Sequence, residues 1–427
     1  MAKHAKNSDH LQLVDAAKTT TVEIPLPLLG AFANIERSFF DLCIDAGQQV
    51  LASMMEQDRE DLCGPRWKRD PDRKAGRTGT TPSEVTLGGR RIAIPRPRVR
   101  SKAGEELGLP SFAFASSRDP LDRQALDAVA CGVSTRKYAR SLDSLPEEID
   151  ERSVSKSSVS RRYVAMTTKQ MTTWLTTPIG DHFPIVMIDG IVLGDHTVLI
   201  ALGIDLEGNK QVLGVREGDT ENSRVAKALL RDLVARGLDP ERARLFVIDG
   251  AKALRSAIRK VFGDLGVVQR CQLHKQRNIL GHLPEGMQAS VKSILQEAWS
   301  LSDAKLARAR LERLASSLEA DHPGAAASVQ EGLEETLTLQ GLGIQGTLYR
   351  KLRSTNSIEN LNSGIVSYSK HVKRWRGGSM VVRWVSAAIV EAGKKFRRVQ
   401  GWQDIQKLVR ALAVFEAKQE ATAERVA

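Results

Sequence analysis

Cysteine is scarce in this sequence, and no two cysteines form a Cys-x-x-Cys pair. The four that occur, Cys43, Cys63, Cys131 and Cys271, are scattered along the chain. Scattered cysteines argue against a disulfide framework and favour reduced thiols, so we expect a cytoplasmic protein.

Long hydrophobic runs are also missing. The most apolar segment, residues 185–204, contains Asp189, Asp195 and His196, which excludes it as a membrane-spanning helix. The start of the chain lacks the apolar segment of a secretory signal, and we find no repeat of solenoid period and no low-complexity tract. At 427 residues the chain is long enough for several globular units.

Acidic residues are outnumbered by basic ones. The 63 Lys and Arg residues against 51 Asp and Glu residues give a formal charge of +12 and a pI near 9.6. This balance favours a polyanionic partner, with nucleic acid first. A membrane surface is not expected, because the basic residues form no single amphipathic face. A protein that is merely basic, without such a partner, is the plain alternative.

The first 115 residues predict a helical region followed by a basic β-hairpin. Residues 1–60 form the N-terminal region, in which apolar residues recur at three- and four-residue steps from about residue 28. Residues 61–115 hold a Pro-, Gly- and Arg-rich segment, 64–80, that predicts a loop. An alternating pattern around Gly88-Gly89 then predicts a hairpin. Four arginines of this segment could contact phosphate groups: Arg90, Arg91, Arg96 and Arg98. A solvated basic loop is the alternative.

Residues 116–180 predict three short helices. The first two are separated at Gly132, and the third starts after Ser155, a candidate N-cap. Basic and hydroxyl side chains crowd the first turns of the third helix: Lys156, Ser157, Arg161 and Arg162. This arrangement is typical of a helix-turn-helix domain, which presents the start of its recognition helix to the major groove of DNA. Any domain with three short helices gives the same outline, so that alternative stays open.

From residue 181 the pattern changes to strands. Three consecutive strands within residues 185–217 are followed by a helix, a strand, a helix and a short strand. The order βββαβαβ matches the mixed sheet of the ribonuclease H-like α/β fold, in which antiparallel strands precede parallel ones. We assign residues 181–274 and 351–398 to this domain, residues 275–350 to an all-helical segment and residues 399–427 to a C-terminal helical tail.

Two of these strands end in Asp-Gly, at Asp189 and Asp249. In this topology the two strands are neighbours, so the carboxylates would lie side by side and repel each other unless a cation lay between them. Hard oxygen ligands suit Mg²⁺, and two such ions about 4 Å apart can stabilise both oxygens of a phosphodiester displacement. Glu359, about one turn into a helix that Ser354 or Thr355 could cap, is the candidate third ligand. Ordinary Asp-Gly turns without a catalytic role are the alternative.

Taken in order, these segments resemble the Mutator-type bacterial insertion-sequence transposases. The likeness is carried by "MIDG", "VIDGAKAL", "QRCQLHKQRNIL" and "RSTNSIENLNSGI", with "GRRIAIPRPR", "GVSTRKY" and "VSKSSVSR" upstream, and it spans about residues 60–400. The resemblance implies a DDE transposase in which Asp189, Asp249 and Glu359 bind two Mg²⁺ or Mn²⁺ ions. It also implies that residues 275–350 are inserted between the second Asp and the Glu.

The activity that the resemblance implies is hydrolysis at the ends of a mobile element. Hydrolysis exposes a 3′-OH, which is then transferred to target DNA without a covalent protein–DNA intermediate. We expect a homodimer or higher assembly that acts on double-stranded DNA, both the terminal repeats of the element and the target.

The resemblance also places Cys271 and His274 beside the active site. Alone, the two residues form one Cys-x-x-His pair, which is half a zinc site. No second pair stands at a suitable spacing, so we expect no bound zinc. A small buried cysteine and a histidine bonded at a helix start are the alternative. We expect Asn356 to support the helix that carries Glu359.

Other basic and aromatic side chains are candidate DNA contacts. Phosphate contacts are expected from residues on both sides of the candidate site: Lys275, Arg277, Lys373, Arg374 and Arg376. A solvated basic face is the alternative. Trp299, in the helical segment, could stack on a displaced base, although packing in a core is the more common role of a tryptophan.

Two rivals to a transposase stay open. The first is a catalytically inactive relative that binds DNA as a repressor or architectural protein, although such a protein has no need to keep three carboxylates. The second is a nuclease of the same fold that never rejoins ends. A large N-terminal DNA-binding part argues against this second rival, because a nuclease that recognises DNA shape needs no module that reads sequence.

Overall fold

The computed structural model describes residues 35–68, 73–87, 90–117, 151–152, 156–218 and 223–426. The chain divides into two compact units, Met1–Tyr163 and Val164–Ala427. Most of the expected helix-turn-helix domain, from residue 118 to residue 150, lies outside the described residues. No helix in the described ranges is long and apolar enough to span a membrane.

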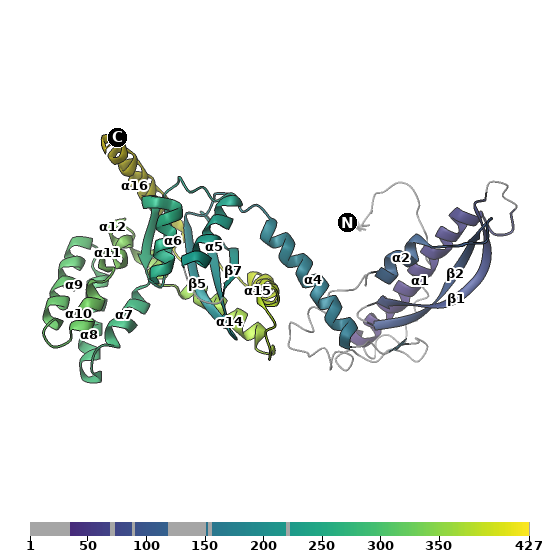
Figure 1. Cartoon of the computed structure of the whole chain (residues 1–427), viewed down its shortest axis with the longest axis horizontal. Helices are drawn as coiled ribbons and strands as arrows, with labels where there is room; N and C mark the ends of the chain where they lie inside the picture. Colours follow the sequence, from purple (N-terminus) through teal and green to yellow (C-terminus); the bar gives the residue numbers. More distant parts are fainter. Residues whose placement is uncertain are drawn as a thin grey trace, which may run out of the picture. The chain divides into compact units, whose positions relative to one another are not determined.

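The first unit is built on a long β-hairpin (Figure 1). Strand β1 (Ala75–Leu87) pairs antiparallel with β2 (Arg90–Ser101), so the hairpin predicted around Gly88-Gly89 is confirmed. Helix α1 (Ile35–Cys63) packs across both strands, and the helix that the apolar spacing predicted is thus present. The remaining elements of the unit are short: β3 (Glu106–Leu107), α2 (Pro110–Ser117) and β4 (Glu151–Arg152). Its core consists of apolar residues from α1, α2 and the hairpin, among them Ile44, Leu51, Met55, Val85, Ile92 and Ile94.

The loop predicted for residues 64–80 is wrong for its last six residues, which belong to β1. The register of the hairpin shifts between Arg77 and Thr80, and Gly79 has a φ of 81° at that shift. A bulge therefore accommodates a glycine-rich sequence inside the strand, and pairing with the regular strand β2 overrides the local turn propensity.

Helix α4 (Lys156–Thr176) follows the short strand β4 and is continuous over 21 residues. The helix expected after Ser155 is thus present, although residues 153–155 themselves lie outside the described ranges. The side chains of Ser157 and Arg161 are exposed on it, whereas those of Lys156 and Arg162 are not described.

A five-stranded mixed sheet forms the centre of the second unit. Its strand order is β7-β6-β5-β8-β9, with β5, β6 and β7 antiparallel and β5, β8 and β9 parallel. The strands are β5 (Ile185–Leu193), β6 (His196–Ile204), β7 (Lys210–Gly218), β8 (Arg244–Ile248) and β9 (Gly266–Arg270). The predicted order of three strands, helix, strand, helix and strand is confirmed, since α5 (Ser223–Ala235) and α6 (Lys252–Phe262) connect the later strands.

Helices cover both faces of this sheet (Figure 1). Helices α5 and α6 pack their apolar stripes on one face, against the side chains of Val186, Ile188 and Phe246. The other face packs against α14 (Asn356–Ser369), α15 (Gly378–Gly393) and α16 (Ile405–Val426), the last preceded by the 3-10 turn η4 (Trp402–Asp404). Successive side chains of a strand point to opposite faces of the sheet. The apolar residues of β5 therefore contribute alternately to the cores on the two faces.

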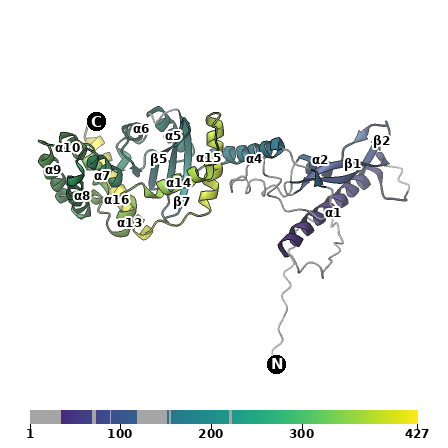
Figure 2. The same cartoon turned by 90° about the horizontal axis from the view of Figure 1, so that it is seen from below.

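The all-helical character predicted for residues 275–350 is confirmed. In Figures 1 and 2, α8, α9 and α10 form a bundle to one side of the sheet. The bundle has its own core, which includes Leu295, Leu311 and Val329. The helices from the end of β9 to the start of α14 are α7 (Gln272–Leu280), α8 (Glu285–Ser300), α9 (Ala304–Leu318), α10 (Pro323–Gln330), α11 (Leu333–Thr336), α12 (Thr338–Gly341) and α13 (Gly346–Leu352).

Candidate active site

The register of the sheet brings Asp189 and Asp249 to the same edge. Strands β5 and β8 pair in parallel with Ile188 opposite Ile248, so each aspartate follows a paired residue. The predicted adjacency of the two strands is confirmed. The expectation that Asp189 ends its strand is wrong, because β5 continues to Leu193 against β6 after β8 has stopped. Asp189 is therefore held by β6 on one side and lies open on the side where β8 has ended.

Asp249 lies in the tight turn between β8 and α6. Its Oδ1 accepts a hydrogen bond from the backbone N–H of Ala251 at 2.9 Å. Gly250 has a φ of 102°, and a Cβ there would lie 2.0 Å from Nε of Arg270. Only glycine fits this position, because a side chain would strain the backbone and displace the arginine. The turn chemistry that the sequence suggested is thus present, and it fixes the direction of the Asp249 side chain.

Asp189 is a half-buried carboxylate with an unusual environment. Burial and the neighbouring charge of Asp249 raise its pKa to about 6, although the backbone N–H of Gly190 and the charge of His274 act in the opposite direction. Nδ2 of Asn362 donates a hydrogen bond to Asp189 Oδ2 at 2.8 Å. The side-chain oxygen of Asn362 is buried, and no hydrogen-bond partner for it is found within the described residues.

Glu359 lies in the first turn of α14. Thr355 occupies the N-cap position, as predicted, but its hydroxyl makes no capping bond. Instead, Thr355 Oγ1 donates to Glu359 Oε1 at 2.6 Å. Asn356, which we expected to support this helix, is exposed, and the amide that reaches the site belongs to Asn362.

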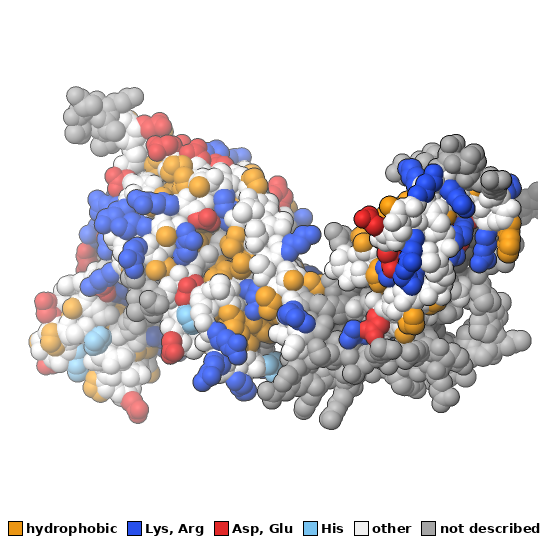
Figure 3. All heavy atoms as spheres, turned by 45° about the vertical axis from the view of Figure 1, so that its right-hand side comes forward, with side chains coloured by type: hydrophobic (Ala, Val, Ile, Leu, Met, Phe, Trp, Pro, Cys, Tyr) orange, Lys and Arg blue, Asp and Glu red, His pale blue; other side chains and the backbone are white. Residues whose placement is uncertain are grey.

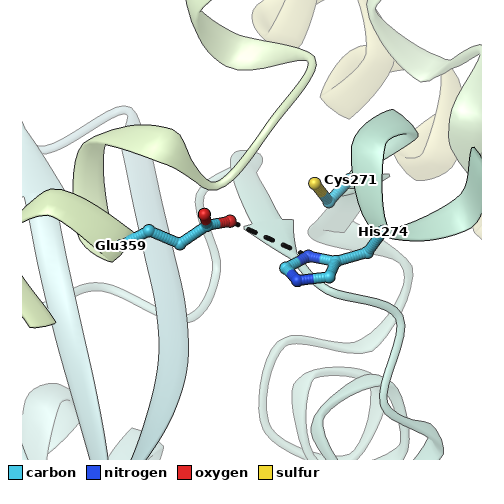
Figure 4. A group of neighbouring side chains, drawn as sticks. All are labelled: Cys271, His274 and Glu359. Atoms are coloured by element: carbon cyan, nitrogen blue, oxygen red, sulfur yellow. Dashed lines mark ion pairs between the residues drawn. The ribbon is translucent and has the colours of Figure 1, made fainter. Parts of the chain in front are cut away.

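Cys271 and His274 lie on the turn between β9 and α7. The backbone N–H of Cys271 donates to Ile248 O at 2.7 Å, and that of Gln272 donates to Arg353 O at 2.9 Å. These two bonds tie the turn to the residue before Asp249 and to the segment before α14. The tertiary connection brings the Cys-x-x-His pair to the start of the helix that carries Glu359 (Figure 4).

The Cys271, His274, Thr355 and Glu359 side chains converge. Thr355 Oγ1 lies 3.4 Å from Cys271 Sγ and 3.4 Å from His274 Nδ1, and that nitrogen lies 3.9 Å from Glu359 Oε1. Burial opposes ionisation of the Cys271 thiol, yet hydrogen bonds from His274 and Thr355 outweigh it and lower the pKa of the thiol. The hydrogen bond with Cys271 raises the pKa of His274 against the effect of burial, and the charges of Glu359 and Asp249 add to it.

Two predicted DNA contacts are instead part of the protein interior. Trp299 is 3% exposed in the core of the helical bundle, and its Nε1–H donates to Thr336 Oγ1 at 3.3 Å. Lys275 is 1% exposed and donates to the backbone oxygen of Glu331, and burial lowers its pKa to about 8. Trp299 therefore packs in the core of the helical bundle, and Lys275 anchors the helical insertion through Glu331. Neither side chain is accessible to DNA in this structure.

The hairpin arginines are largely engaged within the first unit. Arg90 is 1% exposed, on the same face of β2 as Ile92 and Ile94, and Arg91 pairs with Glu84. Arg96 and Arg98 both pair with Glu106, at 3.0 and 2.8 Å. The phosphate contact expected of Arg90 is therefore not available in this structure, and the other three arginines are partly neutralised.

The basic residues beside the candidate site differ from those of the hairpin. Arg277, Lys373, Arg374 and Arg376 are all exposed. Within the described part of the chain, no acidic side chain forms an ion pair with Lys373, Arg374 or Arg376. Figure 3 shows Lys and Arg side chains in several separate groups on the visible face, so total charge alone does not select a DNA-binding surface.

A model of the Mutator family of transposases matches residues 30–399. The chain belongs to this family.

It is 26% identical over 358 residues to the transposase for insertion sequence element IS256 in transposon Tn4001 of Staphylococcus aureus, covering 80% of this chain and 87% of that protein. It is 24% identical over 385 residues to the transposase for IS1081 of Mycobacterium tuberculosis, covering 87% of this chain and 89% of the other. A shorter segment of 164 residues, 38% of this chain and 54% of the relative, is 34% identical to the transposase for IST2 of Acidithiobacillus ferrooxidans. The likeness to Mutator-type transposases that the sequence suggested is confirmed.

Proposed function

We propose that this Mutator-family protein is a DDE transposase with a ribonuclease H-like core, in which Asp189, Asp249 and Glu359 bind two divalent cations. The single observation that carries the proposal is the register of β5 and β8, which sets Asp189 and Asp249 side by side at one sheet edge. The strand order and the mixed directions of the sheet support the ribonuclease H-like assignment.

The donor set fits Mg²⁺ or Mn²⁺. Three carboxylates offer hard oxygen ligands, and Asn362 adds a buried oxygen without a described partner next to Asp189. Burial and the neighbouring charge of Asp249 raise the pKa of Asp189, and a bound cation would offset both effects, which supports the proposal. When bound, the cations would polarise the scissile phosphate and stabilise the attacking and leaving oxygens.

Neighbouring residues of the protein hold the three carboxylates in position. The turn at Gly250 and the N–H of Ala251 fix Asp249, and the amide of Asn362 fixes Asp189. The hydroxyl of Thr355 holds Glu359, which comes from a separate helix. Because the three carboxylates come from β5, the turn after β8 and α14, the site depends on packing between the sheet and α14.

DNA is the proposed polyanionic partner, with homodimers or higher assemblies acting on element ends and target. The segment from Lys373 to Arg376 follows the helix that carries Glu359, and its basic side chains are exposed. Trp375 packs on Gly194 of the β5–β6 turn, where a Cβ would lie 2.6 Å from the indole, so the segment is anchored to the catalytic sheet. We propose that this segment contacts the DNA backbone, while the exposed start of α4, with Ser157 and Arg161, contributes to recognition of the ends.

Replacing Lys373 and Arg374 together by alanine is expected to weaken binding to double-stranded DNA of any sequence. Each lost phosphate contact lowers the slope of log affinity against log salt by about one, so the double variant should lose about two. Fluorescence anisotropy over a salt series measures this slope. The control replaces Lys292 and Lys305, two exposed lysines of the helical bundle, and should leave the slope unchanged. Equal slopes for both double variants would remove the segment from the DNA-binding surface.

The test of the whole proposal uses purified protein and labelled DNA carrying candidate ends from the sequence that flanks the gene. We expect cleavage that exposes a 3′-OH with Mg²⁺ or Mn²⁺, none with EDTA, and joining of a precleaved end to a second duplex. Binding without cleavage in any of these cations would favour the inactive DNA-binding relative. Cleavage without joining of precleaved ends would favour a nuclease.

A further inference from the structure

A second set of metal-ligating side chains shares Glu359 with the candidate active site. One ligand atom each from Cys271, His274 and Glu359 lies within 4.8 Å of the others. Among the described residues, these three form the group of metal-ligating side chains found at that spacing. In Figure 4, the Glu359 side chain extends from its helix toward the His274 ring, with Cys271 beside it on the strand-to-helix turn. Asp189 and Asp249 are not members of this group.

The three ligand atoms lie within 4.8 Å of one another, somewhat farther apart than the ligands of a bound zinc ion. Typical zinc bond lengths place ligand atoms about 3.3 to 3.6 Å apart, and His274 Nδ1 lies 3.9 Å from Glu359 Oε1. Zn²⁺ binding would therefore draw the three side chains closer together than they lie in the structure. A thiolate, an imidazole and a carboxylate together suit Zn²⁺, whereas Mg²⁺ prefers oxygen ligands alone.

The cluster is accessible from one side. Cys271 is fully buried, but the side chains of His274 and Glu359 are 30% and 32% exposed, so an ion could reach the cluster from solution and water could supply a fourth ligand. Thr355, which is also fully buried, contacts all three side chains and closes the inner side.

The fold of this region does not depend on such an ion. Backbone hydrogen bonds from Cys271 to Ile248 and from Gln272 to Arg353 already hold the turn. The side chains also have protein partners, since Thr355 donates to Glu359. A metal here would therefore exchange with solution, in contrast to a structural zinc site whose metal supplies the folding free energy.

We propose that Cys271, His274 and Glu359 form an exchangeable Zn²⁺ site that competes with the catalytic cations for Glu359, so that Zn²⁺ inhibits the enzyme. In the structure, Glu359 Oε1 is engaged on the side of Thr355 and His274, so a Zn²⁺ ion bound there would hold this carboxylate away from the catalytic cations. The binding site stands on the geometry of the cluster, whereas its inhibitory effect rests on the proposed function of Glu359.

The binding test uses Co²⁺ as a spectroscopic substitute for Zn²⁺ in the full-length protein. We expect one equivalent of Co²⁺ to give a thiolate-to-cobalt charge-transfer band that Zn²⁺ abolishes by displacement. The band should be absent in Cys271→Ser and weakened in Glu359→Gln. Cys63→Ser is the matched control, because Cys63 is a free, buried cysteine of the other unit, and this variant should keep the band. Cobalt binding without a thiolate band, or a band that survives Cys271→Ser, would overturn the site.

The inhibition test measures DNA cleavage in Mg²⁺ as Zn²⁺ is added, with each variant normalised to its own rate without Zn²⁺. Loss of one ligand should raise the Zn²⁺ concentration for half-inhibition at least about tenfold in Cys271→Ser. Equal sensitivity of Cys271→Ser and wild type would overturn the competition. A cobalt band in a protein that never cleaves DNA in Mg²⁺ would support the zinc site and overturn the proposed transposase activity, so the two failures are distinguishable.

Discussion

Asp189→Asn is expected to abolish DNA cleavage while making the metal-free protein more stable at pH 8. The substitution keeps the size of the side chain and the oxygen that accepts from Asn362, but removes the negative charge. A ligand that supports metal catalysis contributes several kcal/mol to the transition state, so the rate should fall at least about a thousandfold. Asp249→Asn should be equally inactive, because it removes the other half of the pair.

The gain in stability follows from the environment of Asp189. Its pKa is raised from 3.8 in the unfolded chain to about 6 in the fold, which means that folding opposes its ionisation. The cost is absent below about pH 4, grows between pH 4 and pH 6, and is complete above pH 6. A shift of this size corresponds to about 1–3 kcal/mol, which the asparagine does not incur. In addition, the new amide could donate to the buried oxygen of Asn362.

Thermal unfolding in EDTA from pH 4 to pH 8, beside cleavage assays in Mg²⁺, measures both effects. The control is Asp195→Asn, which makes the same charge change at an exposed position of the β5–β6 turn and should alter neither quantity. Mg²⁺ should raise the unfolding temperature of the wild type and not that of Asp189→Asn. An inactive variant with unchanged stability at every pH would contradict the uncompensated charge, and an active one would remove Asp189 from catalysis.

The sequence was sufficient to predict that the two aspartates lie on neighbouring strands, although it placed Asp189 at a strand end that the structure does not have. Apolar runs of matched length identify β5 and β8, and parallel pairing then forces equivalent positions to the same edge. The residue pattern alone could not predict where the Cys-x-x-His pair would lie, and only the family resemblance placed it beside the active site. That placement depends on the hydrogen bond between Gln272 and Arg353, which joins segments separated by the whole helical insertion.

For two of the side chains that were predicted wrongly or missed, the sequence pattern already indicated a buried position. Arg90 lies two residues before Ile92 and four before Ile94 on β2, so the two-residue period of a strand already places it on their buried face. Asn362 is a polar residue in the apolar stripe that Ile358, Leu361 and Ile365 form on α14. A buried polar group in such a stripe needs a partner, and the partner is Asp189. By contrast, nothing local distinguishes Lys275 from an exposed lysine, because its partner Glu331 lies far along the chain.

Thr355→Val is expected to lower the rate of metal-dependent cleavage about 10- to 100-fold, which is typical when a group that orients a metal ligand is lost. Valine matches the shape of threonine but cannot donate to Glu359 Oε1, the bond that is 2.6 Å long in this structure. Because the Thr355 hydroxyl makes no capping bond to α14, its loss should affect the stability of the helix little. The defect should therefore appear in catalysis and in metal affinity.

Thr355→Ser separates positioning from packing. Serine keeps the hydroxyl and loses a methyl group, so it should recover cleavage to near the wild-type rate although it packs less well in this fully buried position. The measurement is the cleavage rate over a series of Mg²⁺ concentrations, with unfolding temperatures recorded in parallel. Thr355→Val should need more Mg²⁺ for half-maximal rate, and Thr355→Ser should not. If serine were as defective as valine, the methyl group would matter more than the hydroxyl, and Glu359 would be held by packing of α14 alone.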